Sequence, residues 1–287
     1  LENNKEEITK KSGEELNVKY ILDLRDFPGD PYEDKVVHDY NIILNDPEVT
    51  IICETMGGVN PAYDFSKNAL LKGKSVATSN KELVAKHGAE LLAIAKEKKV
   101  NFLFEASVGG GIPIIRPLNN SLTADKIREI TGILNGTTNY MLTKMSQEHM
   151  DYDEVLKEAQ AMGYAESDPT ADVGGLDAAR KAVILASIAF NTRVSLDDVQ
   201  IEGIQNIGIQ DIEYAEKLGY VIKLLAIAKN DPENGISICV RPTMLPKAHP
   251  LASVNDVFNA IFVTGDALGE AMFMGRGAGR YPTASAV

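Results

Sequence analysis

Short apolar stretches alternate with helix-like stretches over the first 105 residues, and this alternation limits the possible folds more than any other feature. The apolar stretches are predicted to be strands over residues 18–24, 49–54, 74–78 and 100–105. The intervening stretches are predicted to be helices over residues 61–71 and 80–99, with Pro61 in one first turn and Ser79-Asn80 capping the other. Strands and helices that alternate at these lengths form βαβ units, so the sequence predicts an α/β fold with a parallel sheet.

The pattern changes after about Asn119, where we expect a second α/β domain to begin. A strand is predicted over residues 126–134. Three helices follow, over residues 137–147, 152–162 and 177–190. Four strands are predicted after them, over residues 221–228, 235–241, 260–264 and 270–274. The segment Gly265–Gly269 has the spacing of a hairpin, which indicates an antiparallel or mixed sheet.

The composition narrows the classes of partner. A net charge of −12 over 287 residues disfavours nucleic acid and anionic membranes. No apolar run reaches the roughly 18 residues of a membrane span, and no signal peptide is visible. Cys53 and Cys239 lie in apolar stretches, so we expect buried thiols in a reducing, cytoplasmic compartment.

The stretch from Gly163 to Lys181 carries the strongest chemical signal. Asp177 and Lys181 are four residues apart at the start of an apolar helix, so they share one face where surface gives way to core. A lysine in this position suits proton transfer. The alternative is an ordinary surface ion pair between neighbouring turns, which would contribute little.

The first domain resembles a dinucleotide-binding sheet, but the chain contains no GxGxxG motif. Residues 1–16 have the character of an exposed helix end, so we expect the motif and its strand to belong before Leu1. Without them, residues 1–287 should bind NAD(P) poorly and leave an unpaired strand edge beside residues 49–54. Arg25-Asp26 follows the predicted strand 18–24, where it could read the adenosine ribose or form a solvated turn.

Six segments resemble the homoserine dehydrogenase family along almost the whole chain: residues 79–83, 104–117, 132–140, 163–169, 176–181 and 277–287. This family interconverts L-aspartate 4-semialdehyde and L-homoserine with NAD(P)(H), in threonine, methionine and isoleucine biosynthesis. The resemblance implies an incomplete Rossmann-like nucleotide-binding domain over 1–118, to which 280–287 returns. It also implies a catalytic and dimerisation domain with a mixed sheet over 119–279.

The resemblance also implies residue roles. Lys181 corresponds to the family's proton-donating lysine, and an ammonium also stabilises oxyanion charge. Glu166 and Asp177 correspond to its substrate-binding carboxylates, which suit the ammonium of an amino acid.

Seven residues are assigned to the cofactor: Lys81, Thr55, Met56, Gly57, Gly163, Gly277 and Arg25. At Gly277 the chain departs from the usual Gly-Pro-Gly-Ala-Gly-Gly of the family, because Arg276 and Arg280 intervene. The alternatives are an ordinary first-turn lysine for Lys81 and simple turn geometry for the glycines.

Glu105, Val108, Gly110 and Ile112 correspond to the family's site for a monovalent cation, Na⁺ or K⁺. One carboxylate with backbone carbonyls suits a hard cation. The alternative is that Glu105 caps the following turn.

These inferences favour an NAD(P)-dependent homoserine dehydrogenase that forms a homodimer or a dimer-based oligomer; the sequence leaves NAD or NADP open. The alternative is a non-catalytic remnant that binds a small amino acid or serves as an oligomer subunit. The missing phosphate loop supports the remnant, and the intact set of Glu166, Asp177 and Lys181 argues against it.

Overall fold

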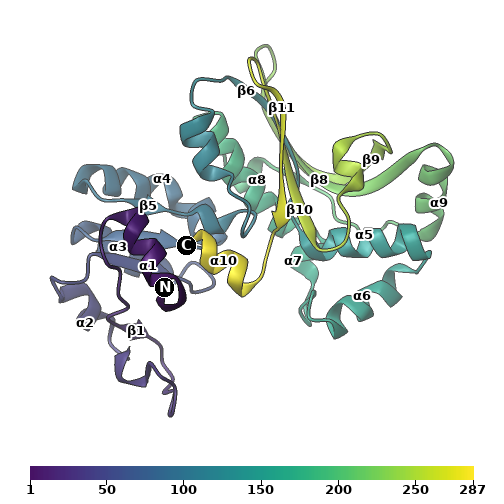
Figure 1. Cartoon of the computed structure of the whole chain (residues 1–287). Coiled ribbons are helices and arrows are strands. Elements are labelled where there is room, and N and C mark those ends of the chain that lie inside the picture. Colours follow the sequence, from purple (N-terminus) through teal and green to yellow (C-terminus); the bar gives the residue numbers. More distant parts are fainter.

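A three-stranded parallel sheet forms the core of the first lobe in the computed structural model, which describes residues 1–287 (Figure 1). The strands lie in the order β3 (Ile51–Glu54), β4 (Ser75–Thr78) and β5 (Phe102–Leu103). The crossover helices are α3 (Ala62–Leu71) and α4 (Lys81–Lys98). These elements confirm the predicted βαβ pattern and the α/β fold class.

The region before β3 holds four short elements, the last of which packs against α3 of the first lobe. It contains α1 (Lys5–Ser12), β1 (Ile21–Leu22), β2 (Val36–Val37) and α2 (Tyr40–Asn45). β1 and β2 pair with each other in parallel over two residues each, so the strand predicted at 18–24 is much shorter than expected.

The strand β3 pairs only with β4, and its other edge has no strand partner. This confirms the expected unpaired edge beside residues 49–54. Alternate residues of a strand face opposite sides, and here Ile51 and Cys53 are exposed whereas Glu54 is buried. The prediction that Cys53 is buried was therefore wrong, and Cys239 is only half-buried.

A six-stranded mixed sheet forms the second lobe. Its strands lie in the order β11 (Gly269–Arg276), β10 (Phe258–Gly265), β6 (Ile127–Ile133), β8 (Tyr220–Asp231), β9 (Gly235–Pro246) and β7 (Gln200–Ile201). All neighbours are antiparallel except β7 and β9, which are parallel. The turn between Gly265 and Gly269 joins β10 to β11, as the hairpin spacing predicted.

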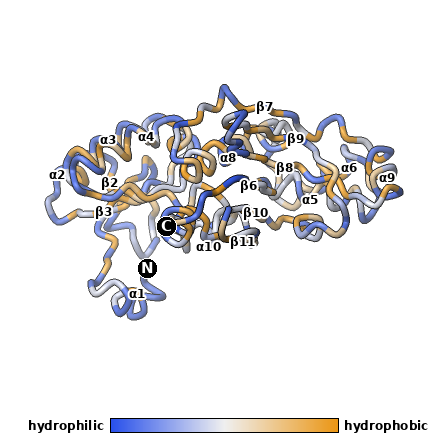
Figure 2. The backbone as a smooth tube through the Cα atoms, turned by 90° about the horizontal axis from the view of Figure 1, so that it is seen from above, coloured by the Kyte–Doolittle hydropathy of each residue, from blue (hydrophilic) through white to orange (hydrophobic).

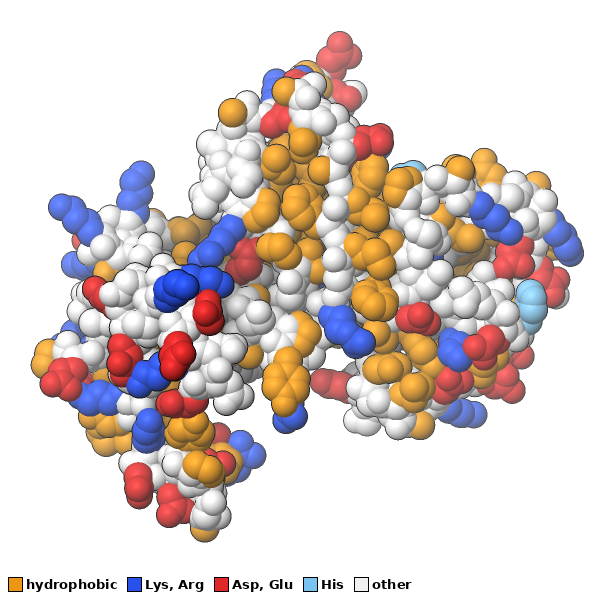
Figure 3. Space-filling model, in the orientation of Figure 1, with side chains coloured by type: hydrophobic (Ala, Val, Ile, Leu, Met, Phe, Trp, Pro, Cys, Tyr) orange, Lys and Arg blue, Asp and Glu red, His pale blue; other side chains and the backbone are white.

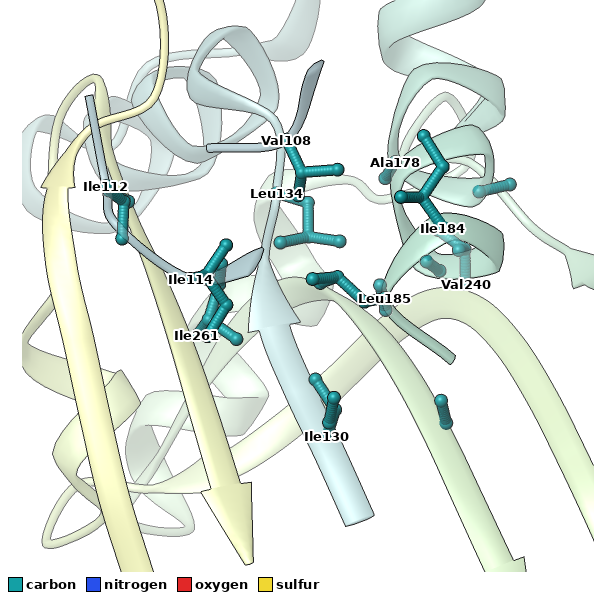
Figure 4. Packing of buried hydrophobic residues seen from close by; sticks show 14 of the residues in the cluster. Val108, Ile112, Ile114, Ile130, Leu134, Ala178, Ile184, Leu185, Val240 and Ile261 are labelled. Atoms are coloured by element: carbon teal, nitrogen blue, oxygen red, sulfur yellow. The ribbon is translucent and has the colours of Figure 1, made fainter. Parts of the chain in front are cut away.

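Helices pack against this sheet and close the main core. They are α5 (Gly136–Glu148), α6 (Tyr152–Ala161), α7 (Thr170–Val173), α8 (Leu176–Ala189) and α9 (Ile209–Lys217). Leu134, which follows β6, lies beside Leu185 of α8 in the buried cluster shown in Figure 4. None of the helices has the length and apolar character that crossing a membrane requires.

The two lobes meet at α4 and α8, and Figure 2 shows them side by side with α8 near the junction. Arg180 of α8 forms an ion pair with Glu82 of α4 at 2.6 Å. The last helix, α10 (Arg280–Ala286), lies against the turn Glu105–Ser107 of the first lobe. The backbone N–H of Gly111 also donates to the carbonyl of Arg276 at 3.2 Å, so the chain crosses the junction again after β11.

Candidate active site

A cluster of two lysines and one aspartate occupies the junction between the lobes; the Lys81 side chain is half-buried and the other two are buried. Asp177 Oδ2 accepts a hydrogen bond from Lys181 Nζ at 2.7 Å, and Asp177 Oδ1 lies 2.8 Å from Lys81 Nζ. Asp177 is 5% exposed and Lys181 is 9% exposed. The pair on α8 therefore shares one face as predicted, and the alternative of an ordinary surface ion pair was wrong.

Asp177 is held as an anion by its neighbours. Burial raises the pKa of Asp177, but the positive charges and hydrogen bonds of Lys181 and Lys81 outweigh burial, so this pKa lies well below its usual range. The three side chains together carry one net positive charge. Such a site can bind or stabilise an oxyanion.

Lys181 has one ammonium hydrogen left for a ligand. Its Nζ donates to Asp177 and, at 2.7 Å, to the backbone carbonyl of Leu134. An ammonium carries three donors, so the third is free to face a substrate oxygen.

Asn135 joins the cluster from the next residue, a role that the sequence did not reveal. It caps α5 by accepting from the backbone N–H of Thr138 at 2.9 Å. Its Nδ2 atom donates to Asp172 Oδ1 at 2.7 Å and to Asp177 Oδ2 at 2.9 Å. Burial raises the pKa of Asp172, while the bond from Asn135 acts against that rise.

The sequence contained a partial signal for Asn135. An Asn that follows a strand and precedes Gly-Thr-Thr is a good helix cap, and the segment 132–140 stood out for its resemblance. The bonds to Asp172 and Asp177 span 37 and 42 residues, so no local pattern predicts them.

The carboxyl ends of β3 and β4 bring four of the seven predicted cofactor residues to one edge of the sheet. Thr55, Met56 and Gly57 follow β3, and Lys81 begins α4 two residues after Ser79. The side chain of Asn80 donates to the carbonyl of Gly58 at 2.6 Å, which ties the two loops together. Ligands of open α/β sheets bind at this edge.

Gly110 and Gly277 approach closely across the junction. A Cβ atom on Gly110 would lie 2.6 Å from the carbonyl oxygen of Gly277, and a Cβ on Gly277 would meet the side chain of Asn259 at 2.0 Å. Packing therefore requires both glycines. Gly163 has a φ of +73° with no atom near its Cβ position, so its geometry fits a simple turn.

Two predicted residues lie apart from the cluster. Glu166 is exposed, and its carboxylate makes no hydrogen bond or ion pair within the chain. Arg25 belongs to the small unit of β1 and β2, where its guanidinium makes two 3.0 Å bonds to Asp23 with 75% of the side chain exposed. The structure thus does not bring Glu166 or Arg25 into contact with Lys181.

The Glu105 carboxylate caps the turn that follows it. It accepts hydrogen bonds from the backbone N–H groups of Ile114, Ile115 and Arg116 at 2.7, 2.9 and 2.8 Å. These bonds use three of about four acceptor positions of a carboxylate. A cation beside Val108, Gly110 and Ile112 would therefore depend mainly on backbone carbonyls.

Sequence models of two domains match most of the chain. The model described as homoserine dehydrogenase matches residues 113–287. The model described as the NAD-binding domain of homoserine dehydrogenase matches residues 6–105.

Individual relatives agree with these matches. A homoserine dehydrogenase of Synechocystis is 52% identical over 252 residues, which cover 87% of this chain and 58% of that protein. The crystal structure of a homoserine dehydrogenase from Thiobacillus denitrificans superposes with a TM-score of 0.94 at 44% identity, covering 100% of this chain and 67% of that chain. A hyperthermophilic archaeal homoserine dehydrogenase in complex with NADPH gives a TM-score of 0.75 at 31% identity, covering 86% of this chain and 72% of that chain. The chain thus spans little more than half the length of the Synechocystis relative.

Proposed function

The chain belongs to the homoserine dehydrogenase family, and on this premise we propose that it catalyses the NAD(P)-dependent interconversion of L-aspartate 4-semialdehyde and L-homoserine. The observation that carries the proposal is the ion-paired cluster of Lys81, Asp177 and Lys181 where the two lobes meet. It lies where an aldehyde could meet both a proton donor and a nicotinamide at the edge of the parallel sheet.

Lys181 is the proposed proton donor. NAD(P)H, when bound, supplies the hydride that the aldehyde carbon receives. The free N–H of Lys181 then gives its proton to the developing alkoxide, and the reverse reaction returns a proton from the alcohol to Lys181. Asp177 and the carbonyl of Leu134 fix the direction of Nζ, so the donor is oriented before the substrate binds.

The carboxylates Asp177 and Glu166 have different proposed tasks. Asp177 already accepts from Lys81, Lys181 and Asn135, so its main role is to hold the two lysines. Glu166 has no partner within the chain, so it is the better candidate to bind the substrate ammonium.

The residues at the sheet edge would hold NADP or NAD. Thr55, Met56 and Gly57 line the end of β3, Lys81 lies beside them, and Gly163 and Gly277 would face the nicotinamide end. Binding of NADPH by an archaeal relative supports this assignment. Arg25 remains a predicted reader of the ribose 2′ position, provided that its guanidinium leaves Asp23.

The alternative function is amino-acid binding without catalysis. The full-length protein should reduce NAD⁺ or NADP⁺ only when homoserine is present, which absorbance at the nicotinamide band measures. Calorimetric binding of homoserine without turnover, in the presence of either dinucleotide, would favour the alternative and contradict the proposed activity.

We propose that the six-stranded sheet carries a dimer contact. Apolar side chains gather over β10 and β11 in Figure 3, and Met272 and Met274 are 40% and 50% exposed there. Such a patch typically marks an interface. A homodimer is the simplest symmetric assembly. Light scattering on the full-length protein should therefore give twice the subunit mass. The proposed location of the protein is the cytoplasm.

A monovalent cation is proposed at the loop after β5. The backbone carbonyls of Glu105, Val108, Gly110 and Ile112 would hold Na⁺ or K⁺, with at most a secondary contribution from the Glu105 carboxylate. The cation would stabilise the loop that Gly110 packs against Gly277. It would not take part in the reaction.

A further inference from the structure

Glu54, the last residue of β3, is a buried carboxylate that no proposed step uses. Its side chain is 4% exposed and has no lysine, arginine or histidine partner. Carboxylates are rarely buried without a cation, because the charged form loses its hydration. Burial accordingly raises the pKa of Glu54. Two hydrogen bonds compensate for that burial, one from the loop after β3 and one from the end of β4.

The first bond folds the loop after β3. Glu54 Oε1 accepts from the backbone N–H of Met56 at 2.7 Å, which turns the chain sharply at Thr55. The second bond crosses to the neighbouring strand, where Thr78 Oγ1 donates to Glu54 Oε2 at 2.5 Å. The carboxylate therefore connects the ends of two adjacent parallel strands.

The connection continues to the start of α4. The backbone N–H of Asn80 donates to Thr78 Oγ1 at 2.9 Å. The Asn80 side chain caps α4 by accepting from the N–H of Leu83 at 3.0 Å and donates to the carbonyl of Gly58 at 2.6 Å. Glu54, Thr78, Asn80 and the loop 55–58 thus form a closed ring of hydrogen bonds, which we name the strand-end clasp.

The strand-end clasp fixes two groups that the proposed function places against the cofactor. One is the loop Thr55–Gly57, and the other is Lys81, which follows Asn80 directly and pairs with Asp177 at 2.8 Å. We propose that Glu54 is a positioning residue for cofactor binding, which presets the loop 55–57 relative to Lys81. This inference rests on the proposed dehydrogenase function.

The chemistry of the clasp explains why a carboxylate is needed. Both oxygens must accept, one from an N–H group and one from a hydroxyl that already accepts from Asn80. An amide has one acceptor oxygen and one donor group, so glutamine could keep the bond from Met56 only by turning its amine toward Thr78 Oγ1, which reverses the second bond and leaves the Thr78 hydroxyl hydrogen without its acceptor. Charge-assisted bonds are also stronger than neutral ones, which keeps the loop rigid before the ligand arrives.

The test uses Glu54→Gln and Thr78→Val in the full-length protein, with Thr78→Ser as the matched control. Thr78→Val deletes the hydroxyl at nearly constant shape, and Thr78→Ser retains it. Titration with NADPH should show a dissociation constant raised about tenfold for Glu54→Gln and Thr78→Val, as for one lost hydrogen bond. Thr78→Ser should bind within about threefold of wild type. The kcat of both clasp variants should change less than their KM for NADPH.

The outcomes separate the inference from the proposed function. Unchanged NADPH affinity in a folded Glu54→Gln or Thr78→Val variant, with a lower melting temperature only, overturns the inference and leaves the dehydrogenase proposal standing. Equal losses in Thr78→Ser and Thr78→Val also overturn it, because the hydroxyl would then be irrelevant. Failure of wild type to bind any NAD(P)H would remove the proposed function, and the inference with it.

Discussion

Two buried lysines in the second lobe differ in a way that separates chemistry from structure. Lys181 on α8 is 9% exposed and Lys223 on β8 is 3% exposed. Each donates to a backbone carbonyl, Lys181 to Leu134 at 2.7 Å and Lys223 to Val254 at 2.6 Å. Lys181 has the carboxylate of Asp177 as its second partner, whereas the other partners of Lys223 are neutral amide oxygens.

This difference leaves Lys181 with one hydrogen-bond donor for a substrate, whereas Lys223 has none left. Lys223 donates to Asn139 Oδ1 and Asn255 Oδ1 at 3.1 Å each, so with Val254 all three of its donors are used. Burial lowers the pKa of Lys223 to about 8, because the negative charge of Asp256 offsets only part of the lost hydration. Burial of a lysine is therefore no sign of catalysis unless a donor remains free and a counter-charge orients it.

Replacing each lysine by methionine tests this contrast most strongly. Lys181→Met removes the proton donor at similar side-chain length, so kcat for homoserine oxidation should fall by roughly two to four orders of magnitude. Lys223→Met should change kcat by less than about tenfold, since Lys223 contacts neither proposed ligand. Steady-state rates of the two full-length variants give the comparison, and similar losses in both would remove the distinction between them.

Glu166→Gln tests the predicted site carboxylate that has no partner in the chain. It deletes a charge at nearly constant shape, so homoserine binding should weaken by about 1.5–3 kcal/mol with kcat less affected. Calorimetric titration of homoserine with the full-length variant measures the change. Asp168→Asn is the matched control, because this neighbouring exposed carboxylate bonds only to Thr170. An affinity equal to wild type would make Glu166 a surface residue.

Because the pKa of Lys223 is lowered, the difference in free energy of unfolding between wild type and Lys223→Met should depend on pH. Its folded pKa of about 8 lies below the ordinary value of 10.5, so between these values the unfolded chain binds more protons than the folded protein. The free energy of unfolding of wild type should therefore rise relative to Lys223→Met from about pH 8 to 10.5, by at most about 3 kcal/mol. Below pH 8 the difference between the two proteins should be constant. Urea unfolding across this range measures it, and parallel pH profiles would show that Lys223 keeps its ordinary pKa.

The proposed cation should have the smallest effect. Replacing choline chloride by sodium or potassium chloride at equal ionic strength should raise the melting temperature by roughly 2–4 °C, the size expected for about 1 kcal/mol. Calorimetry on the full-length protein detects a shift of this size. Identical melting curves in all three salts would argue against a cation beside Glu105.

Local patterns predicted the elements that carry the site. The spacing of apolar residues predicted every strand from 49–54 to 270–274 except the two-residue β7, and also the helix that carries Asp177 and Lys181. Hydrophobic period and capping residues indicate which face of an element a residue occupies. Asn80 was predicted as a cap for the same reason, and its bond to Leu83 confirms it. The helix α9 was missed, although Ile209, Ile212 and Ala215 recur at helical spacing.

Contacts between distant segments could not be predicted in this way. Asn135 reaches Asp172 and Asp177 only because β6 ends beside α8. Glu105 was expected to face a cation, yet the turn that follows it supplies three backbone donors. Sequence spacing shows which residues share an element, and tertiary packing decides which elements share a site.

The central claim is that Lys181 donates the proton at the junction of the lobes. The sharpest test is single-turnover reduction of aspartate 4-semialdehyde by full-length protein preloaded with NADPH, because product release does not contribute to its rate. Lys181→Met should slow this turnover by at least about a hundredfold while its NADPH affinity stays within about threefold of wild type. A single-turnover rate within about threefold of wild type would contradict the assignment of Lys181 as the donor.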